Sequence, residues 1–348
     1  VSMKFFSSQL LEWYNPNRRN LPWKLTADAY KIWLSEIILQ QTRVEQGLPY
    51  YLAFIKKYPT VKRLANAPED DVLKLWEGLG YYSRARNLQF AAKQIMELYN
   101  GVFPSAYADI IKLKGIGSYT AAAIASFAYG LPYAVVDGNV FRVLSRIFAI
   151  ETPIDTTEGK KQFEQLANKL LDTKNPAVYN QAIMDLGALV CKPKLPLCVQ
   201  CPFSSTCKAL ELNTIDKYPV KAKKLIKTER ALHYFVIYNK KYIYLKQRTE
   251  NDIWKGLFEF PLEEHSTSEN TKRSIDSTLY EINHKVLPLL YQQTLTHQYI
   301  KAYFYEMPCS ILPAPQQGWI RVHKSEISSF AFPKIIRQYL SERLIFLT

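Results

Sequence analysis

Four cysteines crowded into one short segment place the strongest constraint on how this chain folds. They follow the spacing C-x6-C-x2-C-x5-C at Cys191, Cys198, Cys201 and Cys207. Thiolates this close in sequence are expected to converge on a metal ion or a metal cluster. A four-cysteine zinc site is the ordinary chemical alternative. The crowding argues against a disulfide framework and favours a reducing compartment, with Cys309 left as a separate buried thiol.

A glycine-rich turn, Leu113-Lys114-Gly115-Ile116-Gly117, lies between two segments with helical patterns. Glycine permits a positive φ and lets another backbone come close. A helix that opens at Ser118 directs free N–H groups outward, where a phosphate binds favourably. Gly115 and Gly117 are therefore candidate phosphate contacts. For the glycines alone, an ordinary connection between two helices is the simpler explanation.

Two acidic residues lie in apolar stretches of the sequence. Asp137 follows Ala134-Val135-Val136 and precedes a helical pattern, so a helix cap is its simplest explanation. Glu36 shares a helical stripe with Ile32 and Trp33. An ionised carboxylate is costly there, so its pKa is expected to be raised. A glutamate at the edge of the stripe, with its head in water, is the open alternative.

The length and net charge of the chain indicate how many domains it has and what kind of partner it binds. A chain of 348 residues is too long for one typical core, so two domains are expected. The net charge of +14 indicates a polyanionic partner, because Lys and Arg neutralise phosphates. No apolar run is long enough to span a bilayer, and the first residues lack a secretory pattern. We therefore expect a cytoplasmic protein with no membrane partner.

The periodicity of apolar residues changes along the chain. In the first two-thirds it predicts helices over 4–14, 29–51, 139–149, 158–171 and 176–190, and two more within 61–100. A basic segment, 213–230, is expected to be a linker. Beyond it, period-two runs predict a hairpin around Asn239-Lys240, strands near 289–296, 299–306 and 319–323, and a final helix over 333–345. We expect a helical domain over 1–212 and an α+β domain over 231–348.

The glycine hairpin, the segment Val136-Asp137-Gly138-Asn139-Val140 and the cysteine spacing together resemble the helix-hairpin-helix DNA glycosylases of the endonuclease III superfamily. The resemblance covers the N-terminal two-thirds of the chain. It implies a mainly α domain, in which a six-helix barrel is joined to an iron–sulfur domain. It also implies that the four cysteines hold a [4Fe–4S] cluster rather than zinc.

One position separates the branches of this superfamily. Bifunctional members place a lysine two residues after the second hairpin glycine, and its amine attacks the sugar. Tyr119 occupies that position here and cannot form a Schiff base. This departure resembles the monofunctional adenine glycosylases. The segments 247–261 and 295–299 resemble the Nudix-like domain with which those enzymes recognise 8-oxoguanine, and the carboxylates of Nudix hydrolases are absent from the sequence.

The resemblance implies a role for each candidate catalytic residue. Glu36 would protonate adenine at N7, while Asp137 would stabilise the oxocarbenium-like sugar and the attack by water. Tyr119 and Asn139 would pack against the sugar and hold Asp137. For the lesion, the family often has Phe-Ser-His where this chain has Leu295-Thr296-His297, so Thr296 and His297 keep the hydroxyl and the imidazole.

The resemblance also implies how the protein meets its substrate, double-stranded DNA with adenine opposite 8-oxoguanine or guanine. Adenine would leave the base stack, at a cost of roughly a few kcal/mol, to reach Glu36. Side chains beside the lesion would wedge into the duplex, while glycines and lysines would position its backbone without reading sequence. These expected DNA contacts are Gln41, Tyr81, Gly115, Gly117, Lys192 and Lys194.

The expected function is therefore a monomeric, monofunctional glycosylase of base-excision repair that hydrolyses the bond between adenine and its sugar. Two alternatives stay open. The first is a bifunctional glycosylase and lyase of the same superfamily, against which Tyr119 argues. The second is a non-catalytic damage sensor that uses the iron–sulfur cluster, against which the presence of both carboxylates argues.

Overall fold

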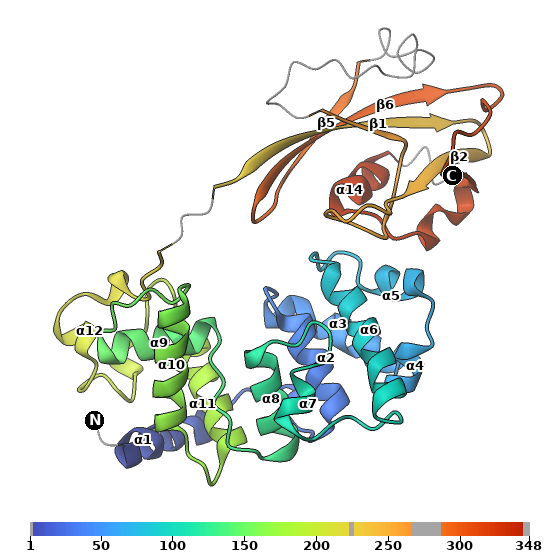
Figure 1. Cartoon of the computed structure of the whole chain (residues 1–348). Coiled ribbons are helices and arrows are strands. Elements are labelled where there is room, and N and C mark those ends of the chain that lie inside the picture. The colour runs from blue at the N-terminus through green and yellow to red at the C-terminus, as the bar shows by residue number, and fades with distance from the viewer. Residues whose placement is uncertain (1–2, 223–225, 266–286, 344–348) are drawn as a thin grey trace. The chain divides into compact units, whose positions relative to one another are not determined.

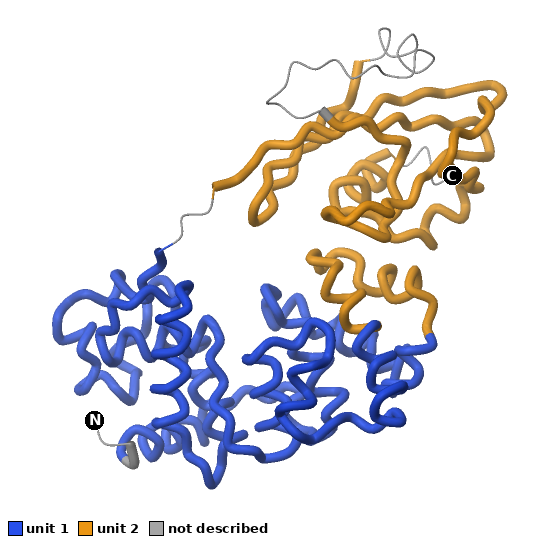
Figure 2. Tube along the Cα trace, in the orientation of Figure 1, with its two compact units in different colours: residues 1–66, 90–224 blue, residues 67–89, 225–348 orange. Residues whose placement is uncertain are grey.

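The computed structural model describes residues 3–222, 226–265 and 287–343. They form two compact units, which Figure 2 distinguishes by colour. Unit 1 consists of residues 1–66 and 90–224, and unit 2 consists of residues 67–89 and 225–348. Within the described ranges, no helix combines the length and the hydrophobicity needed to cross a membrane.

Unit 1 is almost wholly helical (Figure 1). Its helices are α1 (Met3–Asn17), α2 (Ala29–Leu39), α3 (Val44–Lys57), α4 (Val61–Ala65), the end of α6 (Ser83–Leu98), α7 (Tyr107–Ile110), α8 (Ser118–Tyr129), α9 (Gly138–Phe148), α10 (Thr157–Leu170), α11 (Pro176–Leu189) and α12 (Lys208–Glu211). Short 3₁₀ turns occur at Pro22–Lys24, Cys198–Gln200 and Ile215–Lys217.

Two groups of helices meet through α11. In the first group, α2 packs against α3 and α8, and α7 packs against α8. In the second, α1, α9 and α10 enclose a core of apolar side chains that includes Phe6, Val143, Phe163 and Leu186. Because α11 contacts both α8 and α9, it brings α2 of the first group and α9 of the second to one region.

Two predictions about helices were wrong. The helix predicted over 29–51 is broken between α2 and α3, because the chain turns at Gln40 and Gln41 adopts a positive φ of 56°. Between residues 61 and 100 there are three helices rather than two. Pro68 precedes α5 (Glu69–Leu75), and the glycines at 78 and 80, both with positive φ, separate α5 from α6.

Unit 2 contains a mixed sheet with a helix on one face (Figure 1). Its strands are β1 (Thr228–Tyr238), β2 (Tyr242–Gln247), β3 (Phe258–Glu259), β4 (Leu262–His265), β5 (Leu289–Thr294), β6 (Gln298–Pro308) and β7 (Trp319–His323). The main order is β3-β2-β1-β6-β5, with β1 and β6 parallel; β4 also pairs with β1, and β7 with β2. Helix α14 (Lys334–Glu342) stacks Tyr339 on Phe304 with ring centroids 4.2 Å apart.

The predicted hairpin around Asn239-Lys240 is confirmed, since β1 and β2 are antiparallel and the Asn239 side chain accepts from two amides of the turn. The expected boundaries between domains differ from the structure in two ways. Strand β1 begins at Thr228, inside the segment predicted to be a linker. The structure also assigns residues 67–89 to unit 2, because this segment is hydrogen-bonded to C-terminal residues.

Candidate active site

Glu36 lies in the middle of α2, a helix whose N-terminus is capped by Asp28. Its side chain is buried, with 6% of the residue exposed, and the hydroxyl of Tyr119 donates to its Oε2 at 2.6 Å. Burial raises the pKa of Glu36 to about 7. The Tyr119 hydrogen bond and the charge of Lys24 lower it, while the charge of Asp137 raises it. Glu36 is therefore an acid that retains its proton near neutral pH.

Asp137 caps the N-terminus of α9, as its place in the sequence predicts. Its Oδ1 accepts from the amides of Asn139 (2.9 Å) and Val140 (2.8 Å), and its Oδ2 accepts from Asn139 Nδ2 (2.7 Å). Burial raises the pKa of this carboxyl, and these N–H donors oppose the rise because they favour the ionised form. The two acids thus differ in their partners, one hydroxyl for Glu36 and several N–H groups for Asp137.

Both carboxyls border one cavity of about 670 Å³. Its lining comes from α2, α8, α9 and α11, and includes Gln41, Tyr119 and Asn139. This volume lies within the range of roughly 300–1,000 Å³ that is usual for ligand pockets. The structure therefore brings five of the predicted site residues together. It differs from expectation at Tyr119, whose hydroxyl bonds to Glu36 rather than to Asp137.

A third carboxylate, Asp185 of α11, also borders this cavity but is fully paired. Lys24 Nζ lies 2.6 Å from its Oδ2, and Arg19 donates from Nε and Nη2 to its Oδ1 at 2.9 and 2.6 Å. Burial lowers the pKa of Lys24. Asp185 was not identified from the sequence. The signal that identified Glu36, a carboxylate within an apolar helical segment, is also present at Asp185.

Hydrogen bonds connect Asp137 to the cysteine segment. Arg142 donates from Nη2 to Asn139 Oδ1 (2.8 Å) and from Nε to the carbonyl of Cys191 (2.7 Å). The same Nη2 also donates to the carbonyl of Gly187 (2.7 Å). A Cβ at Gly187 would lie 2.6 Å from Cβ of Asn139, so a glycine is required for α11 to approach α9 this closely.

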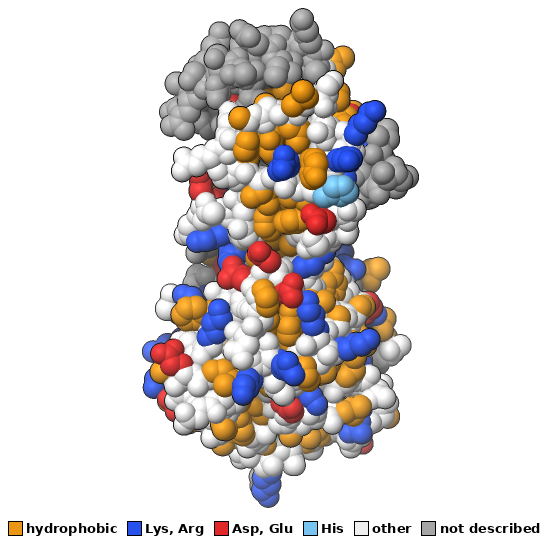
Figure 3. Space-filling view, turned by 90° about the vertical axis from the view of Figure 1, so that its right-hand side faces the viewer, with side chains coloured by type: hydrophobic (Ala, Val, Ile, Leu, Met, Phe, Trp, Pro, Cys, Tyr) orange, Lys and Arg blue, Asp and Glu red, His pale blue; other side chains and the backbone are white. Residues whose placement is uncertain are grey.

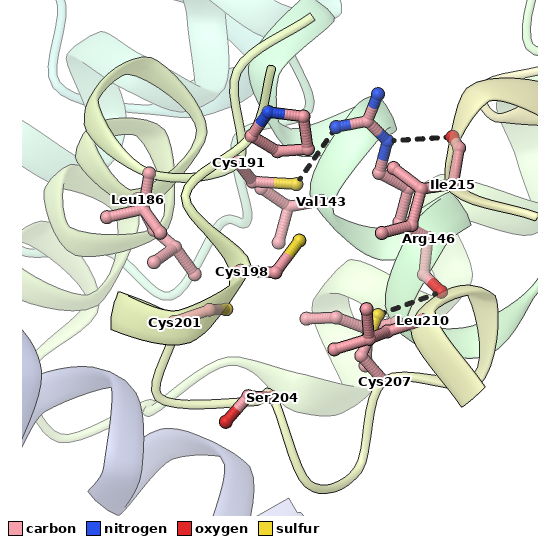
Figure 4. A pocket seen from close by; sticks show the side chains of 13 residues that line it. Val143, Arg146, Leu186, Cys191, Cys198, Cys201, Ser204, Cys207, Leu210 and Ile215 are labelled. Atoms are coloured by element: carbon pink, nitrogen blue, oxygen red, sulfur yellow. Dashed lines mark hydrogen bonds between the residues drawn. The ribbon is translucent and has the colours of Figure 1, made fainter. Parts of the chain in front are cut away.

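The cysteines of the C-x6-C-x2-C-x5-C segment border one cavity, and Figure 4 shows their sulfur atoms pointing toward a common space. They are half-buried free thiols: Cys191, Cys198, Cys201 and Cys207. Arg146 donates to Cys191 Sγ at 3.5 Å and to the carbonyl of Lys192 at 2.7 Å. Among the described residues, no three Cys, His, Asp or Glu side chains are close enough to hold a single metal ion. Cys309 is half-buried and belongs to unit 2, whereas the segment with the other four cysteines belongs to unit 1.

The predicted DNA contacts of unit 1 have accessible positions. Gly115 has a positive φ of 79°, whereas Gly117 has ordinary extended backbone and caps α8. Gln94 holds the turn by accepting from the Lys114 amide at 2.8 Å. Gln41 is exposed, and so is Lys194, whereas Lys192 is half-buried. On the face drawn in Figure 3, Lys and Arg side chains are scattered among apolar and acidic ones rather than gathered in one patch.

The remaining predicted residues lie together in unit 2. Thr296 and His297 form the exposed turn between β5 and β6, and the Thr296 hydroxyl is hydrogen-bonded to that of Tyr81. Tyr81 is exposed and has a positive φ of 48°, which is uncommon for a bulky side chain. These residues border a cavity of about 620 Å³ between residues 78–86 and the C-terminal part of the unit.

Comparison with known families matches both parts of the chain. The family described as "HhH-GPD superfamily base excision DNA repair protein" matches residues 34–172, and the "NUDIX domain" family matches residues 233–342. Among solved structures, a thermostable thymine-DNA glycosylase is 31% identical with a TM-score of 0.57, over 60% of this chain and 97% of that one. An endonuclease III–DNA complex (21% identity, TM-score 0.53, 61% of this chain and 98% of that one) shares the fold.

Relatives from bacteria and eukaryotes carry the same name, adenine DNA glycosylase. The protein of Buchnera aphidicola subsp. Baizongia pistaciae is 42% identical over 74% of this chain and 73% of its own length. The protein of Buchnera aphidicola subsp. Acyrthosiphon pisum is 35% identical over 85% of this chain and 89% of its own. The human protein is 45% identical over 59% of this chain and 39% of its own. With identity of this extent along most of its length, the chain belongs to the adenine DNA glycosylase family.

Proposed function

We propose that this protein hydrolyses the N-glycosidic bond of adenine opposite 8-oxoguanine, or opposite guanine, in double-stranded DNA. The observation that carries the proposal is the single cavity bordered by two carboxyls with different partners, Glu36 and Asp137. Membership of the adenine DNA glycosylase family and a fold shared with an endonuclease III–DNA complex support DNA as the substrate.

The two carboxyls divide the chemistry between them. Glu36 holds a proton near neutral pH and donates it to N7 of a flipped adenine, which makes the base a neutral leaving group. The sugar then develops positive charge. Asp137, whose ionised form is favoured by the amides of Asn139 and Val140, stabilises that charge while water attacks.

The residues around the cavity favour hydrolysis over strand cleavage by a lysine. Tyr119 occupies the position of the lyase nucleophile, and its hydroxyl is committed to Glu36. Lys24 is the one lysine among the described residues that line the cavity, and it forms an ion pair with the buried Asp185. Burial lowers the pKa of Lys24, but the ion pair with Asp185 opposes this effect and favours the ammonium form, which cannot attack the sugar.

We assign the cysteine cavity to a [4Fe–4S] cluster held by Cys191, Cys198, Cys201 and Cys207. The thiols surround a shared space without converging on one point, and this suits a multi-iron cluster better than one zinc ion. When bound, the cluster would hold four points of the loop together. Lys194, exposed on this loop, would contact the DNA backbone, and Lys192 would add positive charge beside it.

In unit 2, Thr296 and His297 contact 8-oxoguanine, while Tyr81 wedges beside the lesion; in unit 1, Gln41 wedges into the duplex. The exposed position and positive φ of both wedge residues support this role, since a strained backbone often marks a functional site. Gly115 and Gly117 meet a phosphate at the N-terminus of α8. The monomeric state and the cytoplasmic location remain expectations from the sequence.

Release of adenine under single-turnover conditions tests the proposal. Duplexes that contain adenine opposite 8-oxoguanine, guanine or thymine are incubated with excess protein, and the free base is measured by chromatography. We expect release from the first two duplexes and an intact abasic strand afterwards. The Glu36→Gln variant should bind these duplexes and release no adenine. Trapping of a protein–DNA adduct by borohydride, or full activity of Glu36→Gln, would refute the proposal.

A further inference from the structure

Glu77, in the turn that follows α5, connects residues 67–89 to the C-terminal part of unit 2. Its Oε1 accepts from the backbone amide of Phe332 at 2.8 Å and from Arg337 Nη2 at 2.7 Å. Its Oε2 accepts from Arg337 Nη2 at 3.0 Å and from Lys74 Nζ at 2.8 Å. The side chain is 17% exposed, so these bonds are partly shielded from water.

Further hydrogen bonds fasten the same segment. The carbonyl of Phe330 accepts from Lys74 Nζ (2.9 Å) and from Arg337 Nη2 (3.1 Å). Arg86 donates to the carbonyl of Lys255. Gln247 Nε2 donates to Asp70 Oδ1 at 3.0 Å. The 67–89 segment is therefore held at several points along its length, and at Glu77 it is held by a partly buried ion pair with Arg337.

The turn that follows Glu77 presents Tyr81. Trp76 Nε1 and Arg84 Nη2 both donate to the carbonyl of Gly80, at 3.0 and 3.2 Å. The Arg84 guanidinium also lies over the rings of Trp76 and Tyr81, 5.0 and 5.7 Å from their centroids. The turn is therefore internally rigid, and its place relative to Thr296 depends on what holds its two ends.

We propose that Glu77 and Arg337 are positioning residues for recognition of the lesion, which rests on the proposed function of Tyr81 and Thr296. Neither side chain borders the cavity at Thr296. The pair holds the Tyr81 turn against the Thr296 turn before DNA binds. A site that is ordered in advance loses less entropy on binding, so the pair increases the preference for 8-oxoguanine over guanine.

The test compares single-turnover release of adenine from duplexes with 8-oxoguanine and with guanine opposite the adenine. Glu77→Gln and Arg337→Gln should each lower the ratio of the two rates by about tenfold, because each removes the ion pair that joins the 67–89 segment to the C-terminal part of the unit. Arg343→Gln is the matched control, since Arg343 pairs with Glu306 at 2.8 Å wholly within the C-terminal part. It should leave the ratio unchanged. Equal loss of both rates in the Glu77 and Arg337 variants would overturn the proposal.

A double substitution tests whether Glu77 acts through Thr296. If it does, Glu77→Gln should not lower the ratio further in a Thr296→Ala background. If the decreases in the rate ratio caused by Glu77→Gln and Thr296→Ala are additive, Glu77 acts independently of Thr296, and the proposal is overturned.

Hydrogen exchange of the DNA-free protein provides a readout that does not depend on substrate. Amides of residues 78–84 should exchange about tenfold faster in both the Glu77 and Arg337 variants, but not in Arg343→Gln. Unchanged exchange would also overturn the positioning role. If wild type releases no adenine, the proposed function fails, while the exchange experiment still decides whether the pair orders the turn.

Discussion

At the scale of single residues, the site depends on what each acid is bonded to. Glu36 has a hydroxyl donor and lies in an apolar helix, whereas Asp137 has N–H donors at the start of α9. The difference is one of hydrogen-bond partners rather than of burial, since burial raises the pKa of both carboxyls. This arrangement leads to three predictions about pH and stability.

The first prediction concerns the pH dependence of adenine release. Because burial raises the pKa of Glu36 to about 7, the catalytic proton is present below that pH and is lost above it. The single-turnover rate should therefore fall about tenfold for each unit of pH above 7. A rate that stays constant from pH 6 to pH 9 would contradict the role of Glu36 as the acid.

The second prediction concerns Tyr119. Its hydrogen bond lowers the pKa of Glu36, so Tyr119→Phe should raise that pKa and move the alkaline limb of the rate profile to higher pH. The rate at pH 6 should change little if this bond is the main contribution. Measurement of the profile from pH 5 to pH 9 checks both points, and a shift to lower pH would be inconsistent with the geometry.

The third prediction concerns stability. The folded protein binds the Glu36 proton more tightly than the unfolded chain does, so stability declines as pH rises from about 4.5 to about 7. Glu36→Gln removes this cost. Its free energy of unfolding should exceed that of wild type by up to about 3 kcal/mol at pH 8 and match it near pH 4. Urea denaturation at the two pH values makes the comparison.

At the scale of elements, α9 connects the cavity to the cysteine segment. Asp137 and Asn139 lie in its first turn, Arg142 lies one turn later, and Arg146 lies one turn beyond. Their bonds run from the carboxylate through Asn139 and Arg142 to the carbonyl of Cys191. The cysteine loop therefore supports the orientation of Asp137, the candidate catalytic aspartate, although the loop is remote from it in sequence.

The fourth prediction separates the contact that α9 makes with Asn139, through Arg142, from the contact that it makes with the cysteine loop, through Arg146. Arg142→Gln should lower adenine release by about tenfold to a hundredfold, because Asn139 loses the partner that orients it toward Asp137. Arg146→Gln is the comparison, since Arg146 contacts Cys191 Sγ and Lys192 but not Asn139. If the loop holds the proposed cluster, Arg146→Gln should weaken the loop, which would be seen as faster loss of the visible absorbance of the cluster on storage. The initial rate of adenine release should fall less than in Arg142→Gln.

At the scale of the whole molecule, the relevant features are the excess of positive charge and the division of the chain into two compact units. Lys and Arg outnumber Asp and Glu by 45 to 31. Unit 2 joins an internal stretch of the helical region, 67–89, with the C-terminal sheet. A candidate wedge, Tyr81, and the candidate lesion contacts Thr296 and His297 therefore belong to one compact body.

The fifth prediction follows from the excess of positive charge. Each phosphate contact made by Lys or Arg releases counterions, so affinity should fall linearly on a logarithmic scale as salt increases. Binding of Glu36→Gln to an adenine–8-oxoguanine duplex should weaken by at least about tenfold between 50 and 200 mM salt. Fluorescence anisotropy measures this slope. An affinity independent of salt would mean that the net charge serves another purpose.

Local patterns in the sequence were sufficient for features whose causes are local. Apolar periodicity predicted most helices and strands, because burial of one face depends on spacing along the chain. The spacing of the cysteines and the cap at Asp137 were recognisable for the same reason. The break between α2 and α3 was not recognisable, because a positive φ at a non-glycine residue such as Gln41 has no signal in the local sequence.

The sequence by itself determined the element types, the loop of four thiols and the two candidate acids, since these depend on neighbours within a few residues. Only the tertiary structure decided that Tyr119 bonds to Glu36, that Asp185 is neutralised by Lys24 and Arg19, and that 67–89 belongs with the C-terminal sheet. Each of these joins groups that are far apart in the chain, from 83 residues for Tyr119 and Glu36 to 260 residues for Arg337 and Glu77. Their pairing depends on how helices and strands pack, which no local pattern encodes.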